Sequence, residues 1–317
     1  MLPVELLREI IRHIAVSDAD EDDEDADNEL SLERSRCSKQ NWNLYSALSL
    51  SSKTLRALVL EVWFRVLVIK DPPGKRLPFP EIRSSWTREI YFIHVEALSW
   101  NINRSWNINE FEKVTKVRID TKISPHFASG LKVVEADIRD IAWPSPMFIV
   151  PISTSFPNLR ILRLRQVRVW CGLCNTCNIP KFEYPGPKYV RYEGGYGLPS
   201  HYTTALASLV NLEAVYLTVG MLQTGGSTLG NEEDENPHLW SGECDRCMEI
   251  MYADESFKIK WLAKKTSVNP RPPRLSLVEW YFWTKKETEE TPWYEDGVET
   301  LESDTGEEES EMDDSTD

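Results

Sequence analysis

The sequence predicts a mixed protein of the α+β or α/β class, in which a small unit of three helices precedes an irregular region of short strands and an acidic tail. Three observations predict this order. Apolar residues recur with the period of a helix in the first 70 residues, and as apolar-x-x-apolar-x-apolar in the middle. From residue 287 onward the chain holds fifteen Asp or Glu and no Lys or Arg. The predicted organisation is a helical unit at 1–70 with an acidic insert at 17–29, a linker at 71–85, a strand-containing domain at 86–284 and a disordered tail at 285–317.

The first predicted helix begins near Pro3, a residue that suits a first helical position because its missing N–H is no loss there. Leu7, Ile10, Ile11 and Ile14 then follow the i, i+3, i+4, i+7 pattern of one helical face. The acidic run that comes next cannot pack on apolar surface, so the helix stands apart from the rest of the chain in sequence.

Two further helices are predicted in "NLYSALSLSSKTLRALVLEVWFRVLVI". Leucines and valines again mark helical faces, and the serines from Ser49 to Ser52 provide a break with an N-cap between the two helices. Three short amphipathic helices make a thin core. We therefore expect this unit to present apolar surface to a partner.

The two apolar segments resemble an F-box. "LPVELLREII" matches the first part of that motif, and "LSLSSKTLRAL" with "WFRVLVI" matches the second part and its exit, although the acidic insert makes the gap longer than in the family. The resemblance implies that the chain docks onto the small adaptor of the SCF ubiquitin ligase, which bridges to a cullin scaffold, and serves ubiquitin-dependent protein degradation. The alternative is a stand-alone protein- or nucleic-acid-binding domain with a structural zinc site, in which these helices form an ordinary subdomain that packs only on its own chain. The residues implied to bind the adaptor are Leu2, Pro3, Leu6, Leu7, Ile10, Leu48 and Leu50.

Six segments in the middle of the chain share the apolar-x-x-apolar-x-apolar pattern. This pattern resembles the strand of a leucine-rich repeat, and many F-box proteins are similar in carrying such repeats, so the resemblance implies an irregular solenoid. The alternative is an irregular α/β domain with no solenoid. The segments are Ile90/Ile93/Val95, Val114/Val117/Ile119, Leu131/Val134/Ala136, Leu159/Leu162/Leu164, Leu212/Val215/Leu217 and Leu275/Val278/Trp280.

The residues that alternate with these apolar positions are expected to form the surface that binds a target. They mix both charges with tyrosine, which favours an unidentified protein target over a uniformly charged polymer. Arg160, Arg163, Arg165 and Arg168 could instead form a basic strip on a stand-alone nucleic-acid-binding domain, but the acidic tail would compete with phosphates, and we do not expect this. The predicted surface residues are His94, Arg118, Glu135, Asp137, Arg163, Arg165, Tyr216 and Tyr281.

The composition and motifs exclude several other classes of protein. The net charge of -15 comes from the acidic insert and the tail; setting aside their nine and fifteen acids leaves 27 Asp or Glu against 36 Lys or Arg. No run of apolar residues is long enough to cross a membrane, and no secretory signal is recognised, so we expect a cytoplasmic or nuclear protein. No catalytic or phosphate-binding motif occurs, and we expect no enzyme activity.

The cysteines suggest the one candidate cofactor, a structural zinc ion. In a reducing compartment they are expected to be thiols or metal ligands. Cys171, Cys174, Cys244 and Cys247 form two C-x-x-C pairs, which can supply the four ligands of a tetrahedral zinc site, with Cys177 or His238 as substitutes. Asn175 and Asn178 follow cysteines and tolerate the left-handed backbone of such turns. The alternatives are thiols without metal and a redox motif, and the "NIPKFEYPGP" that follows disfavours the helix that redox chemistry needs.

Overall fold

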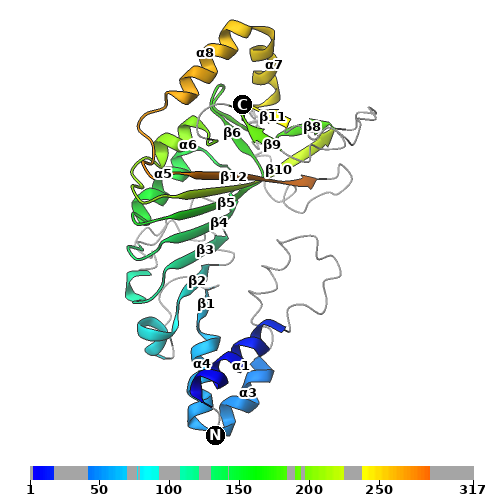
Figure 1. Cartoon of the computed structure of the whole chain (residues 1–317). Helices are drawn as coiled ribbons and strands as arrows, with labels where there is room; N and C mark the ends of the chain where they lie inside the picture. Colours follow the sequence, from blue (N-terminus) through cyan, green and yellow to red (C-terminus); the bar gives the residue numbers. More distant parts are fainter. Residues whose placement is uncertain are drawn as a thin grey trace, which may run out of the picture.

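The chain is a mixed α/β protein built on one parallel sheet with several helices (Figure 1). The computed structural model describes residues 3–17, 42–69, 77, 79–92, 108–120, 130–141, 143–183, 190–193, 197–224 and 238–285. Within these residues, none of the helices has the length and apolar character needed to span a lipid bilayer.

Within the described residues, three helices lie at the N-terminal end of the molecule (Figure 1). They are α1 (Val4–Ser17), α3 (Trp42–Ser51) and α4 (Lys53–Trp63). The predicted break between the last two is confirmed, because the Ser52 hydroxyl accepts from the Leu55 N–H over 3.1 Å and so caps α4. Their small core consists of Ile11, Tyr45, Leu58 and Val59.

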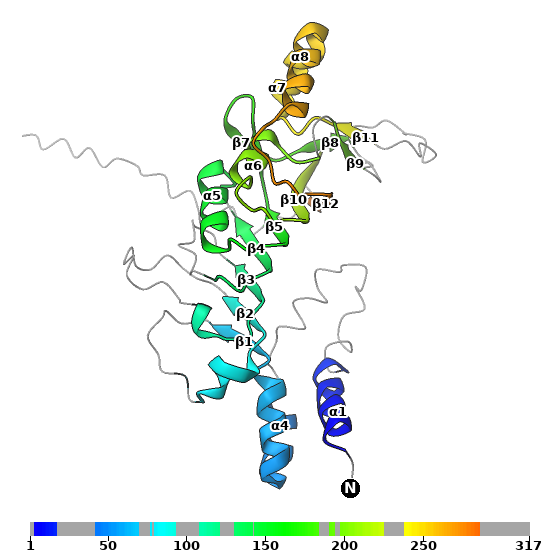
Figure 2. The ribbon, with the colours of Figure 1, turned by 60° about the vertical axis from the view of Figure 1, so that its left-hand side comes forward.

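Seven parallel strands form the path of the main sheet, and their spatial order follows their order in the chain. Figure 2 shows the strands stacked one after another along the molecule. A short eighth strand, β8 (Lys181–Glu183), pairs with the end of β10. The seven are β1 (Val66–Ile69), β2 (Glu89–Phe92), β3 (Lys116–Asp120), β4 (Glu135–Ile141), β5 (Ile161–Gln166), β10 (Ala214–Thr224) and β12 (Leu277–Lys285).

Each step from one of these strands to the next repeats the same backbone contacts. One carbonyl before a strand accepts from two consecutive N–H groups at the start of the next strand, as the Arg65 carbonyl does from Arg88 and Glu89. Because the register is kept, side chains align in columns across the sheet. One apolar column is Leu67, Ile90, Val117, Ala136, Leu162, Val215 and Val278, and the next is Ile69, Phe92, Ile119, Ile138, Leu164, Leu217 and Trp280.

These two columns form one wall of the main core. Helix α5 (Pro146–Ser155) and helix α6 (Ser200–Ala205) cover them, and contribute Ile149, Ile152 and Tyr202 to the core. A π-helical turn at Ile82–Trp86 and a 3₁₀ turn at Ile108–Glu110 lie between the first strands. The opposite face of the sheet carries the polar residues that alternate with the columns.

The alignment corrects two of the six predicted repeats. The triplet that starts at Leu131 is wrong by two residues: the buried triplet is Val133, Ala136 and Ile138, and Leu131 is exposed. A shift of two keeps the same strand face, so Glu135 and Asp137 remain on the polar face. The triplet that starts at Ile90 is wrong by three residues, because Thr87, Ile90 and Phe92 are the buried ones. His94 lies outside the described residues.

The structure also differs from the predicted boundaries. Val66–Ile69, which the sequence groups with the helices, forms β1, the first strand of the sheet. The segment 71–85, predicted as a linker, includes Ile82, which is fully buried in the main core. Lys285, placed in the tail, is the last residue of β12, whereas 286–317 and the acidic insert from residue 18 onward lie outside the described residues.

Two insertions separate the last three strands of the path. The first lies between β5 and β10 and carries β6 (Val169–Cys171), β7 (Thr176–Asn178), β8, β9 (Val190–Tyr192) and α6. The second lies between β10 and β12 and carries β11 (His238–Trp240), α7 (Asp245–Ala253) and α8 (Glu255–Thr266). Parallel pairing of β9 with β11 joins the two insertions. Figure 1 shows α7 and α8 at the end of the molecule opposite the N-terminal helices.

Candidate metal centre

The first half of the candidate metal centre is the hairpin of β6 and β7. The two strands pair antiparallel, with Cys171 opposite Thr176. Asn175 adopts the predicted left-handed conformation, with φ of 56°, and its N–H donates to the Cys171 carbonyl over 3.0 Å. Asparagine tolerates this conformation better than most side chains do. The turn between the strands therefore brings Cys171 and Cys174 close together.

The second half is the start of α7. Cys244 is the residue that precedes the helix, and Cys247 lies in its first turn. The Met248 N–H donates to the Cys244 carbonyl over 2.9 Å, which fixes this turn. Side chains three apart lie on one side of a helix, and the free N–H groups at its start favour negative charge. The helix start therefore presents two thiols on the same side.

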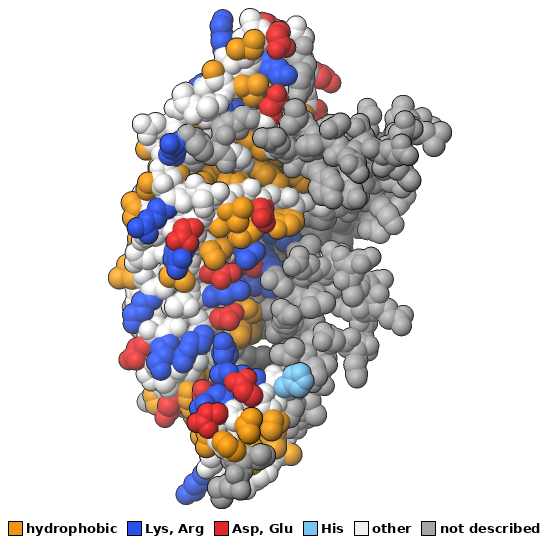
Figure 3. Space-filling model, viewed as in Figure 1, with side chains coloured by type: hydrophobic (Ala, Val, Ile, Leu, Met, Phe, Trp, Pro, Cys, Tyr) orange, Lys and Arg blue, Asp and Glu red, His pale blue; other side chains and the backbone are white. Residues whose placement is uncertain are grey.

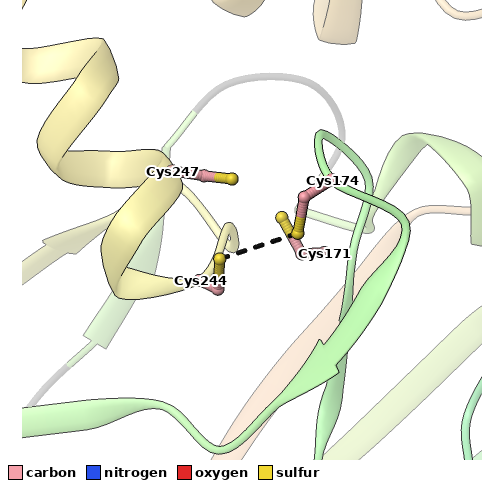
Figure 4. Close-up of side chains that lie close together, drawn as sticks. All are labelled: Cys171, Cys174, Cys244 and Cys247. Carbon is pink, nitrogen blue, oxygen red and sulfur yellow. Dashed lines mark hydrogen bonds between the residues drawn. The ribbon is translucent and has the colours of Figure 1, made fainter.

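The four thiols converge on one point between the hairpin and the helix (Figure 4). Their sulfur atoms all lie within 4.8 Å of one another, and the Cys174 and Cys244 sulfurs are 3.8 Å apart. A tetrahedral zinc ion with Zn–S bonds of about 2.3 Å has sulfur–sulfur edges of about 3.8 Å. All four cysteines are free thiols, since a disulfide bond is about 2.05 Å long. The cluster can therefore hold one metal ion.

Burial and hydrogen bonds together set the pKa values of the thiols in the cluster. Burial raises the pKa of the Cys244 thiol to about 11, and it raises the pKa of Cys247 further. Burial also acts to raise the pKa of Cys174, but hydrogen bonds with Thr176, Cys171 and Cys244 outweigh it and lower that pKa to about 7. Crowded thiolates repel each other, so a divalent cation would favour the deprotonated forms that bind it.

The predicted substitute ligands do not join this cluster. Cys177 is buried in β7 outside the group of four, and burial raises its pKa to about 12 against the opposing charge of Arg168. The His238 side chain lies outside the described part of the chain. The expectation of a left-handed Asn178 is wrong, because Asn178 lies in β7 and Asn175 alone has positive φ among the described residues other than glycine.

Seven of the eight predicted surface residues lie on the polar face of the sheet. Two of them are buried in ion pairs: Arg118 holds Asp120 over 2.8 Å, and Asp137 is held by Arg139 over 2.7 Å. Two others, Arg163 and Glu135, pair over 3.2 Å. The charges on this face therefore largely satisfy one another. Arg165, Tyr216 and Tyr281 complete the seven, and the Arg163 guanidinium stacks over the Tyr216 ring at 4.3 Å.

The predicted adaptor-binding residues divide into two groups. Pro3, Leu6, Ile10 and Leu50 are exposed. Leu7 and Leu48 are partly buried and pack against the core of the three helices. Leu2 lies outside the described residues. Figure 3 shows apolar side chains gathered at this end of the molecule, whereas both charges mix over the sheet.

His201 in α6 is a buried residue for which the sequence predicts no role. Neither ring nitrogen has a hydrogen-bond partner in the described structure, and the ring packs beside Trp170, Tyr202 and Gly172. Burial, together with a smaller effect of the Lys265 charge, lowers its pKa to about 3. No spacing in the sequence marks this position, because its neighbours come from distant segments.

We expect His201 to make the folded chain sensitive to acid. The folded form keeps the ring neutral, so its stability is fully present above the unfolded pKa near 6.5 and is lost as the pH falls below that value. The loss is about 1.4 kcal/mol at pH 5.5 for this residue alone. Urea unfolding at pH 7.5 and 5.5 measures it: His201→Phe should lose less stability on acidification than the native chain. Equal losses in the native chain and His201→Phe would contradict this.

Comparison with known proteins assigns no relative to the chain: no family model, curated protein or solved structure matches it. A functional assignment therefore depends on the chain's own features. These are the thiol cluster, the exposed apolar residues of the N-terminal helices and the polar face of the sheet.

Proposed function

We propose that the chain is the substrate-receptor subunit of an SCF-type ubiquitin ligase, with no catalytic role of its own. The observation that carries the proposal is apolar exposure on the N-terminal helices, where Leu6, Ile10 and Leu50 are 51%, 47% and 80% exposed. Removing a side chain of this size from water is worth about 1.5–3 kcal/mol, so the surface favours a docked partner. The resemblance to the F-box motif supports the small adaptor of the ligase as that partner.

The internal packing of the helices supports this role. Among the described residues, four buried side chains form their core, and the ion pair of Arg8 with Glu61 at 3.2 Å joins α1 to α4. A unit with so small a core gains stability by burying its remaining apolar surface against another protein. The helices lie at one end of the molecule, beyond β1, so a partner docked there would not occupy the opposite end of the sheet (Figure 1).

The sheet would serve as a leucine-rich-repeat-like solenoid that holds the target. The repeated hydrogen bonds and the apolar columns support this reading, since a stack of equivalent units has these features. Its polar face mixes tyrosines with paired charges, which suits a protein target. Two of the four arginines proposed for nucleic acid are neutralised by carboxylates, Arg160 by Glu213 and Arg163 by Glu135, which disfavours that alternative.

The same proposal includes one structural zinc ion held by Cys171, Cys174, Cys244 and Cys247. Zinc prefers four thiolates in a closed tetrahedral site, and a site with no open position stabilises a fold rather than performing chemistry. Iron also accepts four thiolates, and metal analysis separates the two. The ion would join the two insertions, since Cys174 and Cys244 are 70 positions apart in the chain.

Affinity purification of the full chain with mass spectrometry tests the receptor role. We expect the adaptor and a cullin to be recovered together, and their recovery should change little with salt because apolar contacts dominate the docking surface. Recovery of nucleic acid that falls steeply as salt rises, without the adaptor, would contradict the proposal.

A further inference from the structure

A buried ion pair lies directly beside the candidate metal centre. Lys265, near the end of α8, donates from Nζ to a Glu243 carboxylate oxygen over 2.9 Å and also to the Ser241 carbonyl. Both charged side chains are more than nine-tenths buried. Ser241 and Glu243 belong to the short segment between β11 and α7, and the next residue is the thiol ligand candidate Cys244.

Helix α8 holds Glu243 at both carboxylate oxygens. The second oxygen accepts from the Trp261 indole N–H over 2.8 Å, and Trp261 lies one turn before Lys265 on the same side of α8. The Lys265 ammonium also lies 4.9 Å from the centre of the Tyr192 ring. The carboxylate therefore has little freedom to move relative to α8.

The backbone between Ser241 and Glu243 is fixed as well. Gly242 adopts φ of 81°, a conformation that side chains other than glycine rarely take. A Cβ atom at this position would overlap the Tyr192 ring. Three contacts thus fix the segment that ends at Cys244: the Ser241 carbonyl, the approach of Gly242 to Tyr192, and the Glu243 carboxylate.

We propose that Glu243 and Lys265 are positioning residues of the metal centre. They hold the start of α7 so that Cys244 and Cys247 lie within reach of Cys171 and Cys174, and neither one is itself a ligand. This inference rests on the proposed metal site. Because coupling between two sites is reciprocal, a bound ion also holds α8 against the 241–243 segment.

A purely stabilising role explains the pair poorly. Burying two charges costs several kcal/mol, and well-packed apolar residues of similar volume usually stabilise a fold as well or better. Apolar contacts have no preferred geometry, whereas hydrogen bonds to a particular carbonyl and carboxylate specify where the backbone lies. The backbone before α7 must be placed in this way if its two cysteine sulfurs are to meet the other two at one ion.

The test compares zinc affinity in variants of the full chain. The double variant Glu243→Gln/Lys265→Met removes both charges at similar volume, so no unpaired charge is left in the core. Trp261→Phe removes only the indole hydrogen bond. Arg160→Met/Glu213→Gln is the control for charge removal, because it removes an exposed ion pair that does not contact the thiols. Zn²⁺ affinity is measured by competition with a chromophoric chelator, the Co²⁺-loaded form by its absorption bands, and the metal-free form by its melting temperature.

We expect the double variant to bind Zn²⁺ about 10- to 100-fold more weakly and to show altered Co²⁺ bands. Trp261→Phe should show a smaller loss, and the control should match the native chain. A double variant that melts earlier without metal but binds Zn²⁺ like the native chain would overturn the positioning role and leave the metal site intact. A native chain that binds no Zn²⁺ would overturn both the proposed zinc site and the positioning role.

Discussion

Replacing Leu6 and Leu50 with aspartate is expected to abolish co-purification of the chain with the small adaptor of the ligase. Both leucines are exposed in the isolated chain, so the substitutions should leave the three helices folded. In a complex each aspartate would enter an apolar contact without a partner, which costs several kcal/mol, and each lost leucine forfeits about 2 kcal/mol. Together these costs weaken binding at least about 1,000-fold.

The choice of residues keeps the result interpretable. Leu7 matches the F-box motif too, but it packs against the helical core, so aspartate there would test folding rather than docking. Met147→Asp is the control, because Met147 on α5 is 82% exposed and lies on a helix that covers the sheet. Pull-down of the adaptor with each full-length variant, alongside circular dichroism, measures both properties. Full adaptor binding by the folded leucine variant would make the F-box interpretation wrong.

The repeat pattern could be predicted only where all three positions of the triplet are large and apolar. Leu159, Leu162 and Leu164 satisfy this, and the structure buries them as predicted. In β4 the middle position is Ala136, and the nearby Leu131 offers a competing frame two residues earlier. A small side chain is sufficient there because neighbouring strands contribute larger ones to the same column, and a sequence pattern does not contain that information.

The apolar pattern misses β1 and misplaces the triplet of β2 for different reasons. The triplet that includes β2 begins two residues before the strand, at Thr87, whose hydroxyl donates to the Phe64 carbonyl over 3.1 Å. A polar residue that satisfies its hydrogen bond can replace an apolar one at a buried position, and a pattern of apolar residues then starts too late. For β1, the helical period of the preceding segment continues into "WFRVLVI" and hides the change to a strand.

The thiol cluster could be predicted because each half of it is a short sequence motif. Each C-x-x-C pair fixes two ligands by spacing alone, and only the meeting of the two pairs depends on the fold. The ion pair of Glu243 with Lys265 carries no such mark, since the two residues are 22 positions apart and follow no period. His201 is similar, because its burial depends on a packing arrangement that no short stretch of sequence contains.

Cys244→Ser is expected to eliminate stoichiometric zinc from the purified chain and to destabilise the domain by several kcal/mol. The thiolate is the ligand, and a serine hydroxyl does not replace it near neutral pH, so three sulfurs would remain for a site that zinc prefers to fill with four. Because binding to the folded form adds directly to folding free energy, the loss of the ion removes the contribution that joins the two insertions.

The fifth cysteine of the described residues provides the matched control for that experiment. Cys177 is as buried as Cys247 but lies outside the cluster, so Cys177→Ser should keep about one zinc per chain even if it lowers the melting temperature through packing. A chelator should then lower the melting temperature of the native chain and of Cys177→Ser, but not that of Cys244→Ser, which has no ion to lose. The difference between the two variants in their response to the chelator separates metal binding from packing. Both substitutions replace a sulfur by an oxygen, but only Cys244→Ser removes a ligand. Native protein that is free of metal would show that the four thiols lie together without holding an ion, and equal zinc content in the two variants would show that Cys244 is not a ligand.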